Sequence, residues 1–335
     1  MNTLLVVFAL LLATQSIAAQ TRILVANNRV PVAVALNYPG GLALPTICDG
    51  QGRLYVKLVE AGPGMKGPLF RLSSTGTVEA KFDTSGAFIN RYAVRPDGGV
   101  IMIHSEQGAT WFIDNFAPDG TRESSVALER PPVPFFPSQI AVFESGKILL
   151  SGPQIRPGYK ASTAIFDPKG RLVNQLVLEG DVVTENAIAN DTRAQQQNIS
   201  AIGKSVAVIG DDGLVYLMRA TSPVTVYAIS SAGKVVRQIV VGAPSIQASP
   251  DFGVRVAKNK LTVQFQQPCD ASSDSCRSNA CTVVDATTGK QLAVYEAEKE
   301  AQGPLVCFAP DPDRFVIFSQ TAHGLDIVEA EAEPK

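Results

Sequence analysis

Few side chains in this sequence have the type and spacing that catalysis requires. The chain has two histidines, His104 and His323, each near a predicted loop, where a lone histidine is usually a solvated side chain. A Ser-His-Asp hydrolase also needs a serine on a strained turn, and the sequence contains no Gly-x-Ser-x-Gly motif. Residues 203–205 (Gly-Lys-Ser) match the end of a phosphate-binding loop, but Asn198 replaces its first glycine and a strand follows. The sequence therefore assigns no catalytic residue.

The chain contains five cysteines, which in an exported protein predict disulfide bonds and one leftover thiol. Cys48 and Cys307 occupy equivalent positions, in PTIC and PLVC, so we expect a disulfide if those segments are neighbours. The alternative is two buried thiols that pack as small apolar side chains. Cys269, Cys276 and Cys281 lie close in sequence, and their spacing allows any one of three pairings. They lack a Cys-x-x-Cys pair and a nearby His, so we predict no metal site.

The elements that must position these residues are short hairpins that recur along nearly the whole chain. Each is an apolar run, a tight turn rich in Gly or Asp, and another apolar run, as in YAVRPDGGVIMIH. Two hairpin types alternate and so make four-stranded units with a repeat of about 45 to 70 residues, which is typical of a radial array of small sheets. The turns of the first type fall at Gly52, Gly98, Gly146, Gly213, Asn259 and Asp313, and those of the second at Gly76, Gly120, Gly170, Gly233 and Gly289.

On this turn pattern, the chain after its first 19 residues resembles the six-bladed β-propeller superfamily, of the NHL or TolB-like sort. The resemblance implies an all-β fold of six blades, each a four-stranded antiparallel sheet. The last unit has residues for only three strands. We expect residues 21–28 to supply its outer strand by pairing with residues 325–328, which would close the ring and leave no exposed edge.

Propellers that resemble lactonases hold a divalent cation in the central channel, with carboxylate and Asn ligands from the inner strands. At the starts of the inner strands expected here, only Asp251 is acidic. The alternative of a lactonase-like or other hydrolase at the channel mouth is therefore disfavoured. We predict no cofactor and favour a protein that is not an enzyme.

Two kinds of connection distinguish the two faces of such a ring. The tight hairpin turns lie on one face, and the connections on the other face vary in length, as in residues 60–68, 152–162, 180–204 and 268–280. Because irregular loops on a rigid scaffold often carry binding residues, we interpret this variable-loop face as the functional one. The alternative is that the insertions are tolerated because surface loops lengthen at little entropic cost.

Candidate ligand contacts on the variable-loop face are aromatic and arginine side chains, which contribute a large share of binding energy in known interfaces. They are Arg156, Tyr159, Arg193, Phe135 and Phe136. For the two phenylalanines, which lie between prolines, the alternative is that they fill a gap between blades.

Residues 1–19 carry a short apolar stretch followed by small residues, which predicts a cleaved signal peptide; the alternative is an uncleaved anchor. Residues 20–335 are expected to form a single domain. The 29 basic and 31 acidic residues give a net charge of −2, without the basic stripe that nucleic-acid binding requires. We therefore predict a secreted or periplasmic monomer, with no membrane span after signal cleavage, that binds a protein or a glycan through its variable-loop face.

Overall fold

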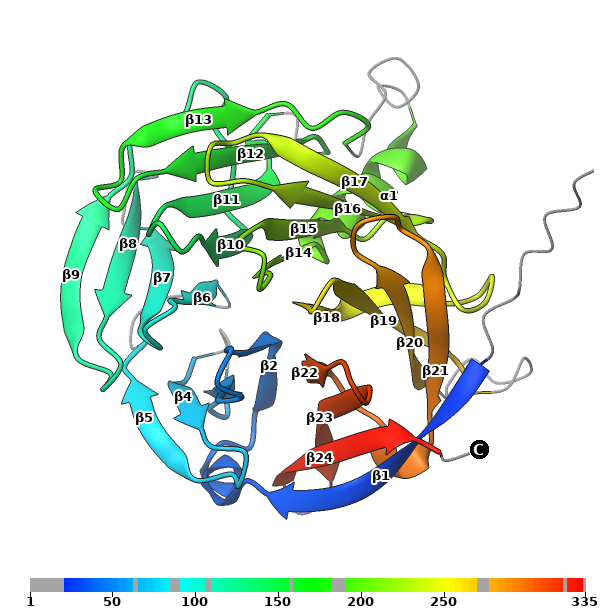
Figure 1. The fold of residues 1–335 in the computed structure, drawn as a ribbon. Helices are drawn as coiled ribbons and strands as arrows, with labels where there is room; N and C mark the ends of the chain where they lie inside the picture. Colours follow the sequence, from blue (N-terminus) through cyan, green and yellow to red (C-terminus); the bar gives the residue numbers. More distant parts are fainter. Residues whose placement is uncertain are drawn as a thin grey trace, which may run out of the picture.

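The structure is a computed structural model that describes residues 21–62, 66–84, 91–105, 110–156, 159–181, 191–269, 277–321 and 324–333. The predicted signal peptide, His323 and Cys276 lie outside these residues. Antiparallel strands are arranged around a central axis and form a β-propeller, as the hairpin repeat and the resemblance predict (Figure 1).

Four separate sheets of four strands follow one another along the chain, and in each the strand order is the sequence order. The first two contain β2 (Gly41–Cys48), β3 (Leu54–Val59), β4 (Leu69–Leu72) and β5 (Val78–Phe82), then β6 (Tyr92–Val94), β7 (Val100–Ser105), β8 (Trp111–Phe116) and β9 (Arg122–Ala127). The next two contain β10 (Gln139–Val142), β11 (Ile148–Pro153), β12 (Ala161–Phe166) and β13 (Leu172–Leu176), then β14 (Val206–Ile209), β15 (Val215–Arg219), β16 (Val224–Ile229) and β17 (Val235–Val241).

The remaining strands form one eight-stranded sheet in the order β18-β19-β20-β21-β1-β24-β23-β22. Two short 3-10 helices, η1 (Ala33–Asn37) and η2 (Lys299–Ala301), lie in its connections. Its strands are β18 (Ser249–Ala257), β19 (Lys260–Pro268), β20 (Arg277–Asp285), β21 (Gln291–Ala297), β22 (Leu305–Ala309), β23 (Arg314–Thr321), β24 (Gly324–Ala332) and β1 (Thr21–Pro31).

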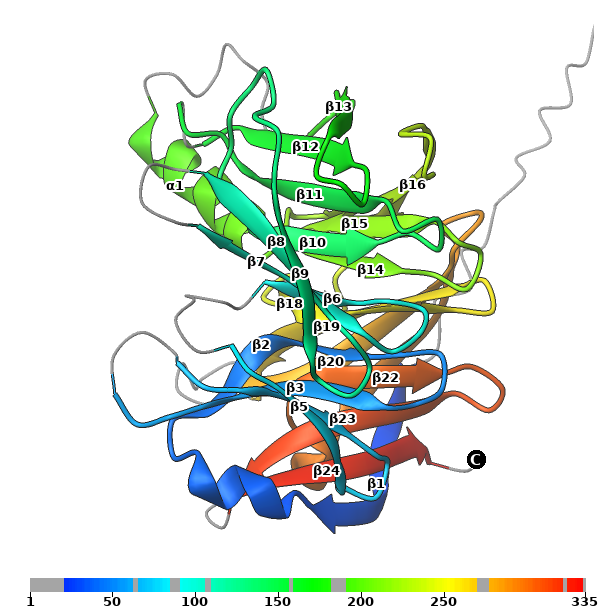
Figure 2. The same ribbon diagram turned by 90° about the vertical axis from the view of Figure 1, so that its left-hand side faces the viewer.

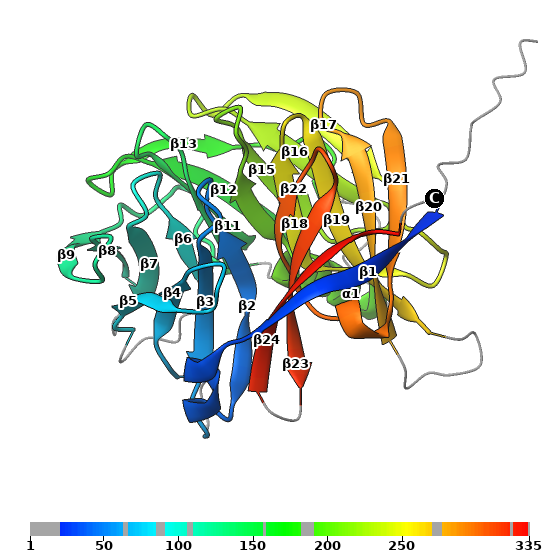
Figure 3. The ribbon, with the colours of Figure 1, turned by 60° about the horizontal axis from the view of Figure 1, so that its bottom comes forward.

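The N-terminal strand closes the ring (Figure 3). β1 pairs antiparallel with β24, with Leu24 opposite Ala332, which confirms that the N-terminal segment supplies the outer strand of the last group. The register differs from the predicted one, because residues 326–328 lie opposite residues 29–31. The first residues of β1 also pair in parallel with β21, with Thr21 opposite Val294, which the sequence did not suggest. In place of six separate sheets, this joint therefore links the last two groups of four strands into one sheet. The joint also satisfies backbone groups that a free edge would expose.

Position within a sheet determines the composition of each strand. β3 is buried at all six residues, because its sheet is covered on both faces by neighbouring groups. By contrast, the outermost strand β9 (RESSVA) is exposed along most of its length. Six hydrophobic clusters formed by the described residues lie between neighbouring groups of four strands. The core is thus built between the sheets around the ring.

The two faces of the ring differ as predicted (Figure 2). The tight hairpin turns lie on one face, where Gly52 (φ 76°) and Gly76 (φ 74°) adopt the left-handed conformation that glycine tolerates best. The last of the first-type hairpins turns between Ala309 and Arg314, so its turn contains Asp313 as predicted, and the positive φ in it belongs to Asp311 (φ 110°). The described residues of the longer connections lie on the opposite, variable-loop face.

One connection on the variable-loop face, predicted to be an irregular loop, contains an α-helix. α1 (Thr192–Gly203) begins where the Asp191 carboxylate accepts hydrogen bonds from the backbone N–H groups of Arg193 and Ala194. This N-cap, followed by residues with good helix propensity, explains the helix within a β-rich chain. Ala201 and Ile202, in the last turn of the helix, are buried. In the part of the chain that the structure describes, no helix has the length and hydropathy needed to cross a membrane.

Candidate functional site

A guanidinium group packed against two aromatic rings lies on the variable-loop face. Arg91 immediately precedes β6, Trp111 is the first residue of β8, and Phe136 lies in the connection between β9 and β10. The Arg91 Cζ atom is 4.3 Å from the centroid of the Phe136 ring and 5.8 Å from that of Trp111. The two rings meet edge to face, with centroids 4.9 Å apart. We call these three residues the aromatic–arginine platform.

The charge of Arg91 has no carboxylate partner among the described residues. Partial burial lowers the pKa of Arg91 to about 10, so the group stays protonated at neutral pH. The ring faces supply the cation–π attraction that replaces part of its lost hydration. Phe136 is 46% exposed. The platform therefore offers a ligand both an open apolar ring and a positive charge that no ion pair with a described residue neutralises.

The structure brings some of the predicted contacts together. The backbone N–H of Phe136 donates to the Pro153 carbonyl at 2.8 Å, which places the Phe136 segment beside the connection that carries Arg156 and Tyr159. Arg156 is exposed and Tyr159 is half-buried. Arg193 is exposed on the first turn of α1, in a different connection.

Phe135 differs from its neighbour in burial. It is only 4% exposed and packs in the cluster between the second and third groups of strands, with Ile140 and Leu150 among its members. This environment fits the packing interpretation of Phe135, whereas Phe136 presents its ring at the surface.

Arg91 and Trp111 were not among the predicted members of the site. A usable signal existed, because both residues stand where a strand begins on the variable-loop face. At such a boundary the strand fixes the backbone of a residue, while the adjoining loop leaves its side chain accessible to a ligand.

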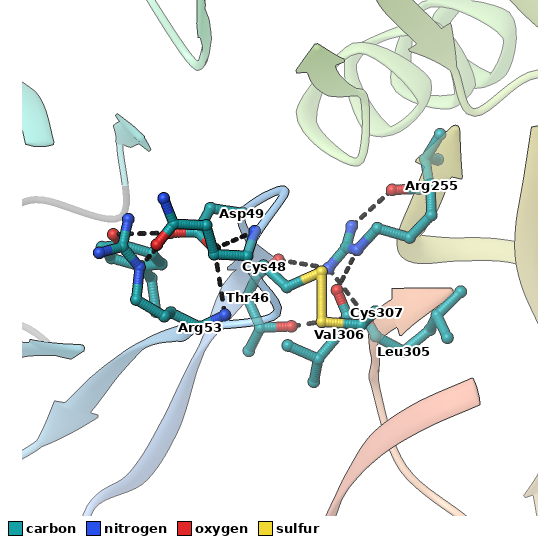
Figure 4. The surroundings of a disulfide bond; sticks show 11 residues. Thr46, Cys48, Asp49, Arg53, Arg255, Leu305, Val306 and Cys307 are labelled. Carbon is teal, nitrogen blue, oxygen red and sulfur yellow. Dashed lines mark hydrogen bonds and ion pairs between the residues drawn. A yellow bond between two sulfur atoms is a disulfide. The ribbon is translucent and has the colours of Figure 1, made fainter. Parts of the chain in front are cut away.

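At the centre of the ring, three inner strands meet at the side chain of Arg255 (Figure 4). Its Nη2 donates to the Thr46 carbonyl of β2 at 2.6 Å and to the Leu305 carbonyl of β22 at 3.0 Å. Its Nε donates to the Val306 carbonyl. Burial lowers the pKa of Arg255 to about 10. Arg255 was not among the predicted site residues, although an arginine within the apolar segment VRVA is unusual.

The predicted Cys48–Cys307 disulfide is confirmed and links β2 and β22 beside Arg255, with the Cα atoms 5.5 Å apart (Figure 4). Cys269 is also disulfide-bonded. Cys281 is a buried free thiol. Burial, with a smaller contribution from the Asp251 carboxylate, raises the pKa of Cys281 to about 12. The Cys281 thiol is therefore protonated at neutral pH and is a poor nucleophile.

Amide side chains lie at the start of the inner strand β10 and on β19, next to the inner strand that carries Asp251. Asp251 accepts a hydrogen bond from Gln266 Nε2 at 3.1 Å. Gln264 bonds to backbone groups of Gly303 and Leu305, and Gln139 Nε2 donates to the Ile202 carbonyl at 2.8 Å. Within the described ranges, no three His, Cys, Asp or Glu side chains converge as a metal site would require.

His104 is held in a contact network between β7 and β8. Its Nδ1 lies 3.1 Å from Asp114 Oδ2, and its ring stacks on Phe112 with centroids 5.3 Å apart. Asp114 also accepts a hydrogen bond from Arg122. These contacts hold the imidazole of His104 between β7 and β8.

Lys57 gives a testable pH dependence. It lies on β3 and is only 1% exposed, and burial lowers its pKa from 10.5 to about 8. Between these two values the unfolded chain binds more protons than the folded chain, so the Lys57 contribution to the free energy of unfolding rises with pH. We expect Lys57→Met to remove this rise in urea unfolding measured at about pH 7.5 and about pH 9.5. An equal rise in the variant and the wild type would contradict the assignment.

Comparisons with known proteins support the fold. No protein-family model matches the chain, and no curated protein matches its sequence. A protein of unknown function from Dyadobacter fermentans has a similar structure, with a TM-score of 0.53, 10% identity, and coverage of 92% of this chain and 99% of that one. A gluconolactonase from Xanthomonas campestris has a TM-score of 0.51, 14% identity, and coverage of 93% and 100%. At these identities the similarity shows the propeller fold alone.

Proposed function

We propose that the chain is an exported six-bladed β-propeller that acts as a binding module and recognises a protein or a glycan through its variable-loop face. The observation that carries this proposal is the aromatic–arginine platform, whose exposed Phe136 ring lies beside the charge of Arg91. The Cys48–Cys307 disulfide supports a secreted or periplasmic location, because such bonds persist in oxidising compartments.

The geometry suits recognition because the platform is ordered before a ligand arrives. Arg91 is fixed between a strand and two rings, so less side-chain entropy is lost on binding than for a free surface arginine. An aromatic face can contact the apolar side of a sugar ring or a protein side chain, while the guanidinium can donate to an oxygen acceptor. Arg156, Tyr159 and Arg193 are proposed as further contacts on the same face.

Replacing Arg91 and Phe136 together by alanine is expected to weaken ligand binding by about 2 kcal/mol or more, because the two side chains form one anchor. The ligand would be identified with a glycan array and with extracellular proteins of the native source. Binding would then be measured by calorimetry. Replacing Arg156, Tyr159 and Arg193 together should weaken binding by about 1 kcal/mol.

The matched controls are Lys169→Ala and Lys234→Ala, which change exposed cations on the tight-turn face. They should leave both binding and thermal unfolding unchanged. Equal loss of affinity from changes on both faces would refute the assignment of the binding face. Hydrolysis of a lactone or an ester by the purified protein with an added divalent cation would refute the non-enzymatic part of the proposal.

A further inference from the structure

A pocket with an apolar interior wall and polar groups at its rim lies between the second and third groups of strands. It has a volume of about 180 Å³. Its wall is formed mainly by aromatic, aliphatic and proline side chains, and the residues that line it come from β8, β11, β12 and the two connections beside them. We call it the Trp111 pocket, and it is lined by Thr110, Trp111, Leu128, Glu129, Arg130, Pro131, Pro134, Phe135, Pro137, Leu150, Ile155 and Phe166.

The size of the pocket limits what it can hold. An apolar cavity of roughly 150 Å³ is enough for one benzene molecule. The 180 Å³ measured here therefore corresponds to one six-membered ring with a short substituent. Its deeper wall is rigid, because Leu150 and Phe166 are almost completely buried. A wall of this kind does not need to reorganise when a ring enters it.

The rim of the pocket carries two charged residues, of which one is already engaged. The backbone N–H of Leu172 donates to Glu129 Oε2 at 2.8 Å. This carboxylate therefore holds the β9–β10 connection against the start of β13. Arg130 is exposed, and in the described parts of the chain its guanidinium has no hydrogen-bond or ion-pair partner. Arg130 is therefore the rim group available to a bound molecule, and its charge favours an anion.

We propose that the Trp111 pocket binds a small aromatic acid, with the ring in the apolar cavity and the carboxylate, one or two bonds away, paired with Arg130. This site goes beyond the proposed recognition of a protein or a glycan, because it takes a small molecule and uses a different arginine. The two sites share only Trp111, whose ring contacts Phe136 and also lines the pocket.

The sequence offers a direct readout, because Trp111 is the only tryptophan in the chain. Titration of the full-length protein with phenylacetate should change the Trp111 fluorescence in a saturable way, with a dissociation constant of about 1 mM or lower. Phenylacetamide has the same shape without the charge and should bind about three- to fivefold more weakly, as expected for loss of one exposed ion pair.

Two variants complete the test. Arg130→Ala should weaken phenylacetate binding about three- to fivefold and leave phenylacetamide binding unchanged. Its matched control is Arg314→Ala, an exposed arginine on the tight-turn face, which should change neither. Ile155→Trp enlarges an exposed side chain at the pocket mouth and should weaken both ligands at least tenfold in ligand-observed NMR, with thermal unfolding confirming that the variant is folded.

Absence of a saturable signal, or phenylacetate binding that Ile155→Trp leaves unchanged, would overturn the pocket assignment. Equal affinity for the acid and the amide, or no effect of Arg130→Ala, would overturn the role of Arg130. Tighter binding of 2-phenylethylamine than of phenylacetate would show that Glu129 selects cations and would overturn the anionic class. None of these outcomes depends on whether changes at Arg91 and Phe136 affect a macromolecular ligand.

Discussion

Replacing Arg219 by methionine is expected to lower the free energy of unfolding by about 3 to 5 kcal/mol. Arg219 ends β15 and is 0% exposed. Its Nε and Nη2 donate to the two carboxylate oxygens of Asp181 at 2.7 and 3.0 Å, and Nη2 also donates to Ser151 Oγ at 2.9 Å. The variant keeps the apolar volume but leaves a partly buried carboxylate without its bidentate guanidinium partner, which is the arrangement that destabilises most.

Urea unfolding at neutral pH measures this effect. The matched control is Arg171→Met, which breaks the ion pair with Asp167 at an exposed turn and should change stability by less than about 1 kcal/mol. Adding Asp181→Asn to Arg219→Met should recover part of the loss, because the carboxylate charge is then also removed. Exposed ion pairs contribute at most about 1 kcal/mol. If Arg219→Met alone lowers the free energy of unfolding by less than about 1 kcal/mol, the pair has no structural role beyond that of an exposed one.

The parts of the fold that were predicted from sequence depend on local signals. Gly52 and Gly76 mark turns because a positive φ favours glycine, and the apolar runs on either side must then pair with each other. Repetition of this local unit implies the propeller, and a unit short of one strand implies closure by the N-terminal segment. The Cys48–Cys307 bond follows from the same repeat, since equivalent positions become neighbours when a ring closes.

The parts that were missed depend on contacts between distant segments. Arg255 and Thr46 are separated by 209 positions, and Arg219 and Asp181 by 38, so no local pattern relates either pair. The parallel pairing of β1 with β21 was also not predicted, because it depends on how far β1 extends past β24. The aromatic–arginine platform likewise assembles from distant segments, namely two connections and the first residue of β8. Sequence periodicity locates strands and turns, but it does not determine which side chains meet across the gaps between them.

Removal of the Cys48–Cys307 disulfide by the double change to alanine is expected to lower the free energy of unfolding by about 3 to 5 kcal/mol. The bond spans 259 residues, so its loss returns a large amount of conformational freedom to the unfolded chain. The folded ring should persist, because Arg255 still joins β2, β18 and β22, and β1 still pairs with β24. Chemical unfolding of the purified variant, compared with the oxidised wild type, measures the loss.

The same variant separates closure of the ring from binding. The platform residues Arg91, Trp111 and Phe136 belong to the second group of strands and the connections beside it, whereas the disulfide joins the first and last groups. Affinity for a ligand of the variable-loop face should therefore change less than about twofold at a temperature where the variant is fully folded, since distant sites contribute additively. A stability loss below about 1 kcal/mol would mean that Arg255 and β1 alone fix the ends of the ring. A large loss of affinity in the folded variant would instead place part of the binding surface at the closure between β2 and β22.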